Sequence, residues 1–127
     1  MSKVLLVGHC GPDSTYLRIA VKSALGNGTF TSADDPAELE KAIADGVDLV
    51  LLNRELGWGF ESTSGVDLIK LLKSKHAQLK IIMISNYADA QAEAVAAGAL
   101  PGFGKRQIGS PQATKLLREA MGLQTPS

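Results

Sequence analysis

Polar side chains that could do chemistry follow four apolar segments of the chain. His9 and Cys10 come after the first segment, Asn53 after the second, Ser85 after the third and Lys105 after the fourth. An ammonium, a hydroxyl and an amide brought together could hold an anion, helped by backbone N–H groups near a helix start. A thiol beside a histidine could instead attack a phosphate ester. The sequence therefore raises two kinds of chemistry, anion binding and thiol catalysis.

The thiol hypothesis rests on Cys10. The pattern of cysteine-dependent phosphatases is His-Cys, five residues and then Arg, whereas Tyr16 stands at that place here and Arg18 follows two residues later. Those two extra residues would carry Arg18 around the helix, away from a phosphate. Pro12 also removes an N–H donor that a phosphate-binding loop needs. The sequence favours a loop cysteine without a catalytic role, and a Cys10-dependent phosphatase is kept as an alternative.

Metal and flavin sites are also considered at this end of the first apolar segment. His9 and Cys10 are adjacent and point apart on an extended chain, and His76 is expected at the opposite end of the sheet. Zinc sites usually need three or four such ligands, so no metal site is predicted. A flavin-binding module would need a phosphate loop rich in Ser, Thr and Gly, which residues 8–15 match only weakly.

Short apolar segments indicate the strands that must position these side chains. Three of them are continuously apolar, as strands are in a parallel sheet covered on both faces. A further segment is rich in residues that favour strands. The expected strands are 4–7, 29–31, 48–52, 81–84 and 99–103.

Helical patterns alternate with the expected strands. Asp35 can accept hydrogen bonds from free N–H groups at a helix start, and Glu38 completes a capping box. Gly98 can adopt the left-handed conformation that ends a helix. We expect one helix from residue 13 or 14 to Gly26 or Gly28, one from Asp35-Pro36, two over 66–73 and 88–97, and one that opens at Ser110-Pro111.

This alternation predicts the fold class. Strands and helices that alternate with short loops form a doubly wound parallel sheet, here a five-stranded sheet in a three-layer α/β/α arrangement. Ligands bind such folds at the carboxyl ends of the strands. We therefore expect any site to lie just after Val7, Leu52, Ile84 and Phe103.

Length and composition limit the other possibilities. The 127 residues fit one domain over 1–127, with a core over about 3–122 and a tail over 123–127. Thirteen basic residues balance thirteen acidic ones, so we expect neither a nucleic-acid partner nor a membrane partner. With one cysteine, no signal peptide and no long apolar stretch, the chain is predicted to be cytoplasmic.

Several motifs together resemble the receiver domain of response regulators. DLVLLNREL resembles its third strand, with Asn53 where the phosphorylated aspartate belongs. IIMISNY and GALPGFGK resemble its later segments, with Ser85 as the hydroxyl residue and Lys105 as the active-site lysine. The resemblance spans Lys3 to about Gly122 and implies the flavodoxin-like strand order 2-1-3-4-5.

The chain departs from the receiver pattern where phosphorylation takes place. In the family, an acidic pair after the first strand and the third-strand aspartate hold Mg²⁺. Gly8 and His9 occupy the acidic-pair positions here, and Asn53 replaces the nucleophile. Mg²⁺ prefers oxygen ligands with at least one carboxylate, and an amide is too weak a nucleophile to form an acyl phosphate. We therefore expect no cofactor, loss of Mg²⁺ binding and no enzymatic activity.

The lysine that remains has two possible roles. Lys105 is expected to hydrogen-bond Asn53, unless Asp13 or Glu55 reaches it, because an unpaired buried ammonium is costly. Alternatively, Asn53, Ser85 and Lys105 together hold an anion.

The switch aromatic of the family is also displaced. Gly102 stands at its position and Phe103 comes one residue late, which sends the phenyl ring to the opposite face of the strand. Tyr87 is a candidate substitute. Trp58 and Phe60 lie among glycines beside the site, either as contacts for a protein partner or as a plug over the strand ends.

These features predict an atypical, stand-alone receiver domain in phosphorelay-type signalling, without a DNA-binding or catalytic output domain. It is expected to act by protein–protein binding that does not depend on phosphorylation. The implied partners are signalling proteins such as a histidine kinase or another two-component protein. The implied contact face is built from the fourth helix, fifth strand and fifth helix. The alternative is a sensor that responds to an anion or another small ligand.

Overall fold

The computed structural model describes residues 3–9, 11–26, 28–54 and 64–123. Within these ranges, no helix is both long enough and apolar enough to cross a membrane. Predictions on Cys10, Glu55, Trp58 and Phe60 fall outside the described residues.

The strands are β1 (Lys3–Val7), β2 (Thr29–Ala33), β3 (Leu49–Asn53), β4 (Ile81–Ile84) and β5 (Leu100–Phe103). The helices are α1 (Gly11–Leu25), α2 (Pro36–Asp45), α3 (Gly65–Lys75), α4 (Ala88–Ala96) and α5 (Pro111–Ala120), with a short 3₁₀ helix over Lys105–Gln107.

The strands form one five-stranded sheet in the order β2-β1-β3-β4-β5, and all its pairs are parallel. In the central register, Leu5 of β1 is opposite Val50 of β3, which is opposite Ile81 of β4. The predicted fold class and strand order are both confirmed. Because every strand runs the same way, all the carboxyl ends meet at one edge of the sheet.

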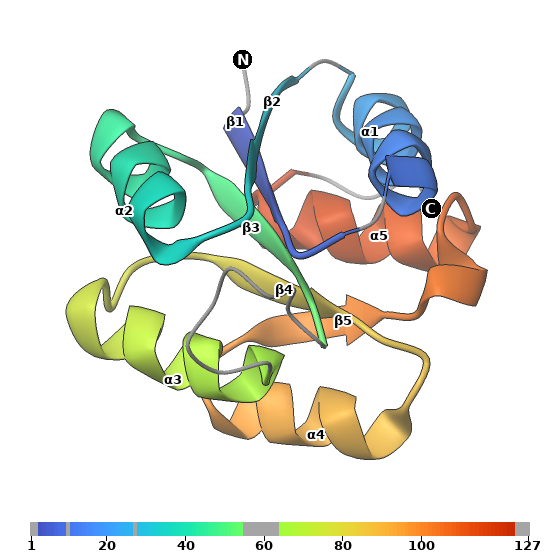
Figure 1. Cartoon of the computed structure of the whole chain (residues 1–127). Coiled ribbons are helices and arrows are strands. Elements are labelled where there is room, and N and C mark those ends of the chain that lie inside the picture. Colours follow the sequence, from blue (N-terminus) through green and yellow to red (C-terminus); the bar gives the residue numbers. More distant parts are fainter. Residues whose placement is uncertain (1–2, 10, 27, 55–63, 124–127) are drawn as a thin grey trace.

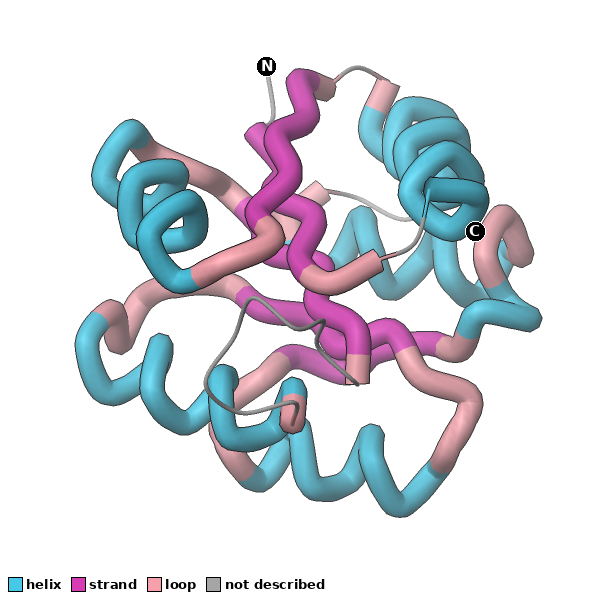
Figure 2. The backbone as a smooth tube through the Cα atoms, viewed as in Figure 1, coloured by secondary structure: helices cyan, strands magenta, loops and turns pink. Residues whose placement is uncertain are grey.

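The helices cover the sheet on both faces, as Figures 1 and 2 show. Leu5 and Val50 point into a cluster under α2, α3 and α4. Leu6 and Leu51 point into a second cluster under α1 and α5. Two-sided burial explains why these strands are apolar without alternation, since each fully buried aliphatic side chain contributes roughly 1.5–3 kcal/mol.

The helix starts follow the expected capping chemistry, with two differences. α1 begins at Gly11, two residues before the earliest predicted start, and Pro12 is tolerated there because the first turn has no use for its N–H. At α2, Asp35 Oδ1 accepts a hydrogen bond from Glu38 N (2.8 Å), as predicted. Glu38 Oε1 accepts from Asp34 N (3.2 Å), not from Asp35 N, so the second half of the predicted capping box is wrong.

The remaining boundaries lie close to the predicted ones. α3 is longer than predicted and starts at Gly65, where a Cβ atom would overlap the carbonyl oxygen of Asn53. The side chain of Ser110 caps α5 by accepting from Ala113 N (3.1 Å). Gly98, with φ of 115°, follows α4 in the left-handed region. Gly65 thus brings the start of α3 close against the end of β3.

The β5 strand at the edge of the sheet is irregular. Between Leu100 and Phe103 it advances three residues, while β4 advances two between Ile82 and Ile84. The extra residue shifts the register, as a β-bulge does. Pro101, within this irregular stretch, is exposed and has no N–H to donate.

Candidate functional site

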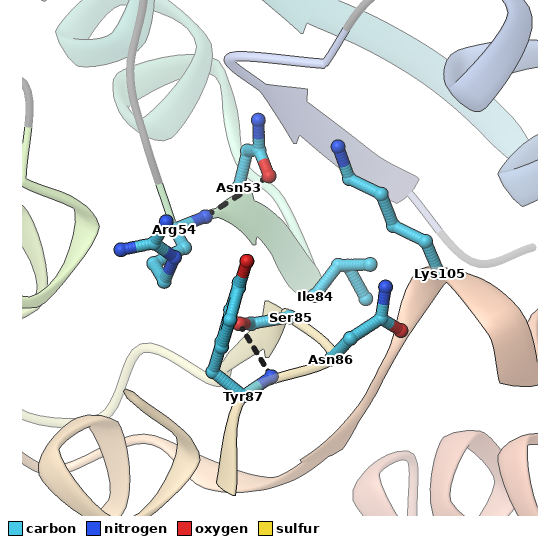
Figure 3. A pocket seen from close by; sticks show the side chains of 7 residues that line it. All are labelled: Asn53, Arg54, Ile84, Ser85, Asn86, Tyr87 and Lys105. Carbon is cyan, nitrogen blue, oxygen red and sulfur yellow. Dashed lines mark hydrogen bonds between the residues drawn. The ribbon is translucent and has the colours of Figure 1, made fainter. Parts of the chain in front are cut away.

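The carboxyl ends of β3 and β4 and the segment after β5 border a pocket of about 280 Å³. Asn53, Ser85 and Lys105, the three residues predicted to share a site, all line it. Figure 3 shows Lys105 on one side of the pocket and Arg54 and Tyr87 on the other. The full lining is Asn53, Arg54, Ile84, Ser85, Asn86, Tyr87 and Lys105.

Asn53 ends the central strand and joins two strand ends through its amide. Its Nδ2 donates to the carbonyl oxygen of Gly8 at 3.1 Å, which links the end of β3 to the end of β1. Its Oδ1 accepts from the backbone N–H of Arg54 at 3.0 Å. Gly8 has φ of 76°, the left-handed region that favours glycine. Donor and acceptor of the amide are thus both engaged in holding the backbone.

Lys105 pairs with a carboxylate. Its Nζ lies 3.1 Å from Asp13 Oδ2, so the predicted hydrogen bond to Asn53 is replaced by the ion pair considered as an exception. The early start of α1 places Asp13 in the first helical turn, where the helix dipole favours a negative charge. The side chains are 42% and 22% exposed, which limits the pair to about 0–1 kcal/mol.

Ser85 is the buried polar group of the pocket. The residue is 5% exposed, and its Oγ accepts from the backbone N–H of Tyr87 at 3.2 Å. Its own N–H donates to the carbonyl oxygen of Phe103 at 3.0 Å, which ties the end of β4 to β5. The hydroxyl proton can still be donated, because the Tyr87 bond uses only a lone pair of the oxygen.

Arg54 and Asn86 are pocket residues that the sequence analysis did not single out. The guanidinium of Arg54 lies 4.7 Å from the centre of the Tyr87 ring, a cation–π distance. Tyr87 is itself 62% exposed. Asn86 Oδ1 accepts from the backbone N–H of Arg106 at 3.1 Å. Both residues directly follow predicted site residues, and that adjacency is the signal that could have identified them.

The candidate switch positions lie on different faces of β5. Phe103 is buried in the cluster under α1 and α5. A Cβ atom on Gly102 would come within 2.6 Å of Gln91 Oε1, so Gly102 faces α4. Tyr87, the candidate substitute, is placed beside Arg54 at the pocket.

His9 is turned into the protein at the end of β1. Its Nε2 lies 2.9 Å from the carbonyl oxygen of Leu51. A carbonyl can only accept, so Nε2 carries the proton of the neutral ring. Nδ1 is buried and has no hydrogen-bond partner among the described residues. Burial lowers the pKa of His9 below 6.5. The Leu51 bond and Asp13 oppose this lowering to a smaller extent, and Lys105 has the smallest effect, which lowers the pKa further.

Comparison with known proteins gives matches among solved structures alone. No protein-family model matches the chain, and no curated protein does. The signal receiver domain of a DNA-binding response regulator from Colwellia psychrerythraea superposes with a TM-score of 0.74 at 16% identity, over 96% of this chain and 99% of that one. The receiver domain of NtrX from Brucella abortus gives 0.73 at 23% identity, over 97% and 100%. A response regulator from Thermotoga maritima gives 0.71 at 20% identity, over 96% and 98%.

The chain has the receiver fold. At these sequence identities the matches support the fold alone, and any function has to be argued from the residues of the site. Within the receiver fold, the position that the resemblance assigns to the phosphorylated aspartate is the end of β3, where Asn53 stands.

The described side chains at this edge do not fit a Mg²⁺ ion. The ring of His9 points to Leu51, and both ends of the Asn53 amide are engaged. Asp13 faces Lys105, whose ammonium competes with any cation. Across the described ranges, no three His, Cys, Asp or Glu side chains gather as a metal ion would require. The described side chains therefore offer no ligand set for a metal-dependent step.

The buried ring of His9 predicts a pH-dependent stability. Since the folded state holds its pKa below 6.5, the unfolded chain binds the proton more readily, and stability is lost as pH falls below 6.5. One such proton contributes a slope of at most about 1.4 kcal/mol per pH unit. Urea unfolding of the natural protein and of His9→Gln, between about pH 7.5 and about pH 5.5, measures it.

The His9→Gln variant should lose stability less steeply over this range than the natural protein. His76→Gln is the matched control, because it removes the other histidine and keeps His9. Equal slopes for the natural protein and His9→Gln would show that His9 is not responsible.

Proposed function

We propose that this protein is a receiver-like signalling module that binds a protein partner without being phosphorylated on an aspartate. Its partner would be a histidine kinase or another protein of a two-component pathway. We propose no catalytic activity and no Mg²⁺ requirement. The observation that carries the proposal is the hydrogen bonding of Asn53, the residue at the acceptor position.

Phosphorylation of a receiver needs a nucleophilic carboxylate and a cation that neutralises the incoming phosphoryl group. An amide oxygen is a poor nucleophile, and Asn53 Oδ1 already accepts a hydrogen bond from Arg54. Gly8 contributes only backbone, and its carbonyl oxygen accepts from Asn53. His9 is directed at Leu51. These contacts support a site whose side chains hold the strand ends together and do not accept a phosphoryl group.

The positive charge of Lys105 has a counter-ion within the fold. Removing carboxylates from a receiver pocket leaves the lysine without counter-ions. Here Asp13 lies 3.1 Å from Lys105 and supplies one. An ion pair at this place lets the pocket persist without a phosphoryl group or a metal, which supports a role that does not depend on either.

The face built from α4, β5 and α5 offers a surface for the partner. A hollow of about 460 Å³ lies between α4, β5 and the 3₁₀ helix, lined by Tyr87, Gln91, Gly102, Arg106 and other residues. Tyr87 is 62% exposed at its rim, and Val95 of α4 is 45% exposed. Exposed aromatic and aliphatic side chains beside a hollow are common in protein interfaces.

Asn53 should not accept a phosphoryl group from a small acyl phosphate. Incubation of the natural protein with Mg²⁺ and a small acyl phosphate should leave its intact mass unchanged, because no described carboxylate stands at the acceptor position. The variant Asn53→Asp should also gain little, because Gly8 and His9 still lack the oxygen ligands for Mg²⁺. A Mg²⁺-dependent gain of one phosphoryl group by the natural protein contradicts the proposal.

The partner should bind the face built from α4, β5 and α5 whether or not acyl phosphate is present. Purified two-component proteins from the source organism would be tested by a surface-binding assay, with and without acyl phosphate and Mg²⁺. We expect a partner whose affinity is the same in both conditions. Ala92→Arg, on the exposed side of α4, should weaken binding by at least about tenfold, as charges placed in interfaces do.

Ala44→Arg is the matched control for this assay, because Ala44 is an exposed alanine on α2, away from the face. It should bind like the natural protein. Binding that requires acyl phosphate, or that Ala92→Arg leaves intact, would contradict the proposed mode.

A second candidate function is the sensing of a small anion. The 280 Å³ pocket is lined by the cations Arg54 and Lys105 and by the hydroxyl of Ser85. The ion pair with Asp13 is partly exposed, so an anion could compete with that carboxylate for Lys105. This arrangement suits a small phosphate or carboxylate.

Titration with inorganic phosphate, followed by amide resonances, tests the second candidate. Resonances of Ser85 and Asn86 should shift and saturate, and Lys105→Ala should abolish the shift. Lys115→Ala is the control, because that lysine is exposed on α5 and pairs with Glu119. The same shifts with chloride at equal ionic strength would contradict a specific anion site.

A further inference from the structure

Gln91 makes an unusual set of contacts on the side of α4 that faces the sheet. Its Nε2 lies within hydrogen-bond distance of the carbonyl oxygens of Met83 (2.9 Å), Ser85 (3.1 Å) and Phe103 (3.3 Å). Met83 belongs to β4, Ser85 directly follows β4, and Phe103 ends β5. One amide group therefore connects α4 with two neighbouring strands.

Glycine in β5 makes this contact possible. A Cβ atom on Gly102 would overlap the carbonyl oxygen of Met83 and would lie 2.6 Å from Gln91 Oε1. Any larger residue at position 102 would therefore force Gln91 or the backbone to move. The amide of Gln91 occupies the space between α4 and β5 that a side chain at position 102 would need.

Asn86 and Gly104 form a second contact of the same kind between an amide side chain and a glycine. A Cβ atom on Gly104 would overlap Asn86 Oδ1. That oxygen accepts from the backbone N–H of Arg106 and so fastens the β4–α4 connection to the 3₁₀ helix after β5. Both glycines of the segment Pro101–Gly104 thus admit a polar side chain from the neighbouring element.

Hydrophobic packing gives α4 little other attachment. Of its nine residues, Ala94 alone is buried, and Ala90 is a partly buried neighbour of the core. A methyl group contributes roughly 0.8 kcal/mol on burial, so an alanine-rich helix is weakly held by packing. Hydrogen bonds from the partly buried Gln91 amide to backbone carbonyls therefore weigh more here than they would in a leucine-rich helix.

We propose that Gln91 is a positioning residue that holds α4 in one arrangement on β4 and β5, whatever the state of the pocket at Lys105. The surface formed by α4 and β5 is then presented constantly. The role of this surface in signalling rests on the proposed function, because a partner has to bind there. The attachment itself is a property of the isolated protein and needs no partner to be measured.

Native-state hydrogen exchange tests the attachment. Gln91→Met keeps the length of the side chain and removes the N–H groups that contact the carbonyl oxygens of Met83 and Ser85, while the Phe103 carbonyl keeps its bond from the Ser85 N–H. Protection of the α4 and β5 amides should fall by about tenfold or more, while α2 amides keep theirs. Glu93→Met, at an exposed position of the same helix, is the matched control and should leave α4 unchanged. Equal protection of α4 in both variants would overturn the proposal.

A measurement on the natural protein covers the case in which Gln91→Met fails to fold. The side-chain NH₂ protons of Gln91 should exchange with solvent at least about tenfold more slowly than those of the exposed Gln78, because they are hydrogen-bonded. Exchange as fast as that of Gln78 would overturn the proposal.

Independence from the pocket is tested with Lys105→Ala. This variant removes the ion pair with Asp13 and should leave the α4 exchange rates as they are in the natural protein. Faster exchange throughout α4 would show that the helix follows the pocket. Neither result depends on a partner, so failure of this inference and failure of the proposed binding role are distinguishable.

Discussion

Burial of the central strands on both faces is the constraint on which the site depends. Residues of β1, β3 and β4 that point to either face meet helices, so polar side chains can be accommodated only where the strands end. Parallel pairing then brings those ends to one edge. Asn53, Ser85 and Lys105 are far apart along the chain and line one pocket for this reason.

At that edge, hydrogen bonds to backbone groups take up much of the polar chemistry. The amide of Asn53, the ring of His9 and the hydroxyl of Ser85 each have a backbone partner. A group committed to the backbone is oriented by the fold and is less available to a substrate. The side chains at the carboxyl ends of the strands therefore mainly hold the backbone in place, and a small pocket lined by Arg54 and Lys105 lies beside them.

The sequence predicts the fold well and the site less completely. Continuous apolar segments identify the strands, and the Asp35-Pro36 and Ser110-Pro111 pairs identify two helix starts, because these signals are local. The resemblance also names three of the residues that line the pocket, Asn53, Ser85 and Lys105. The partners of the site's side chains were predicted only in part, since Asp13 was one of two carboxylates considered for Lys105 and Leu51 was not considered for His9. The pairing of Lys105 with Asp13, and of His9 with Leu51, depends on how distant elements are placed in space.

Gln91 illustrates the same limit more strongly. Nothing in the alanine-rich segment distinguishes it from a solvent-exposed helix residue. Its role follows only once β4 and β5 lie side by side and Gly102 leaves room between them. The displaced Phe103 was visible in the sequence, but the group that takes the vacated space was not.

The irregular β5 strand also bears on how copies of this chain meet. An open sheet ends in strands whose free backbone groups can pair with those of another molecule. On β5, Pro101 lacks an N–H and the shifted register interrupts the regular spacing of donors and acceptors. A second copy therefore finds no continuous ladder to extend along this edge. The same short segment that admits the amide of Gln91 thus disfavours edge-to-edge pairing through β5.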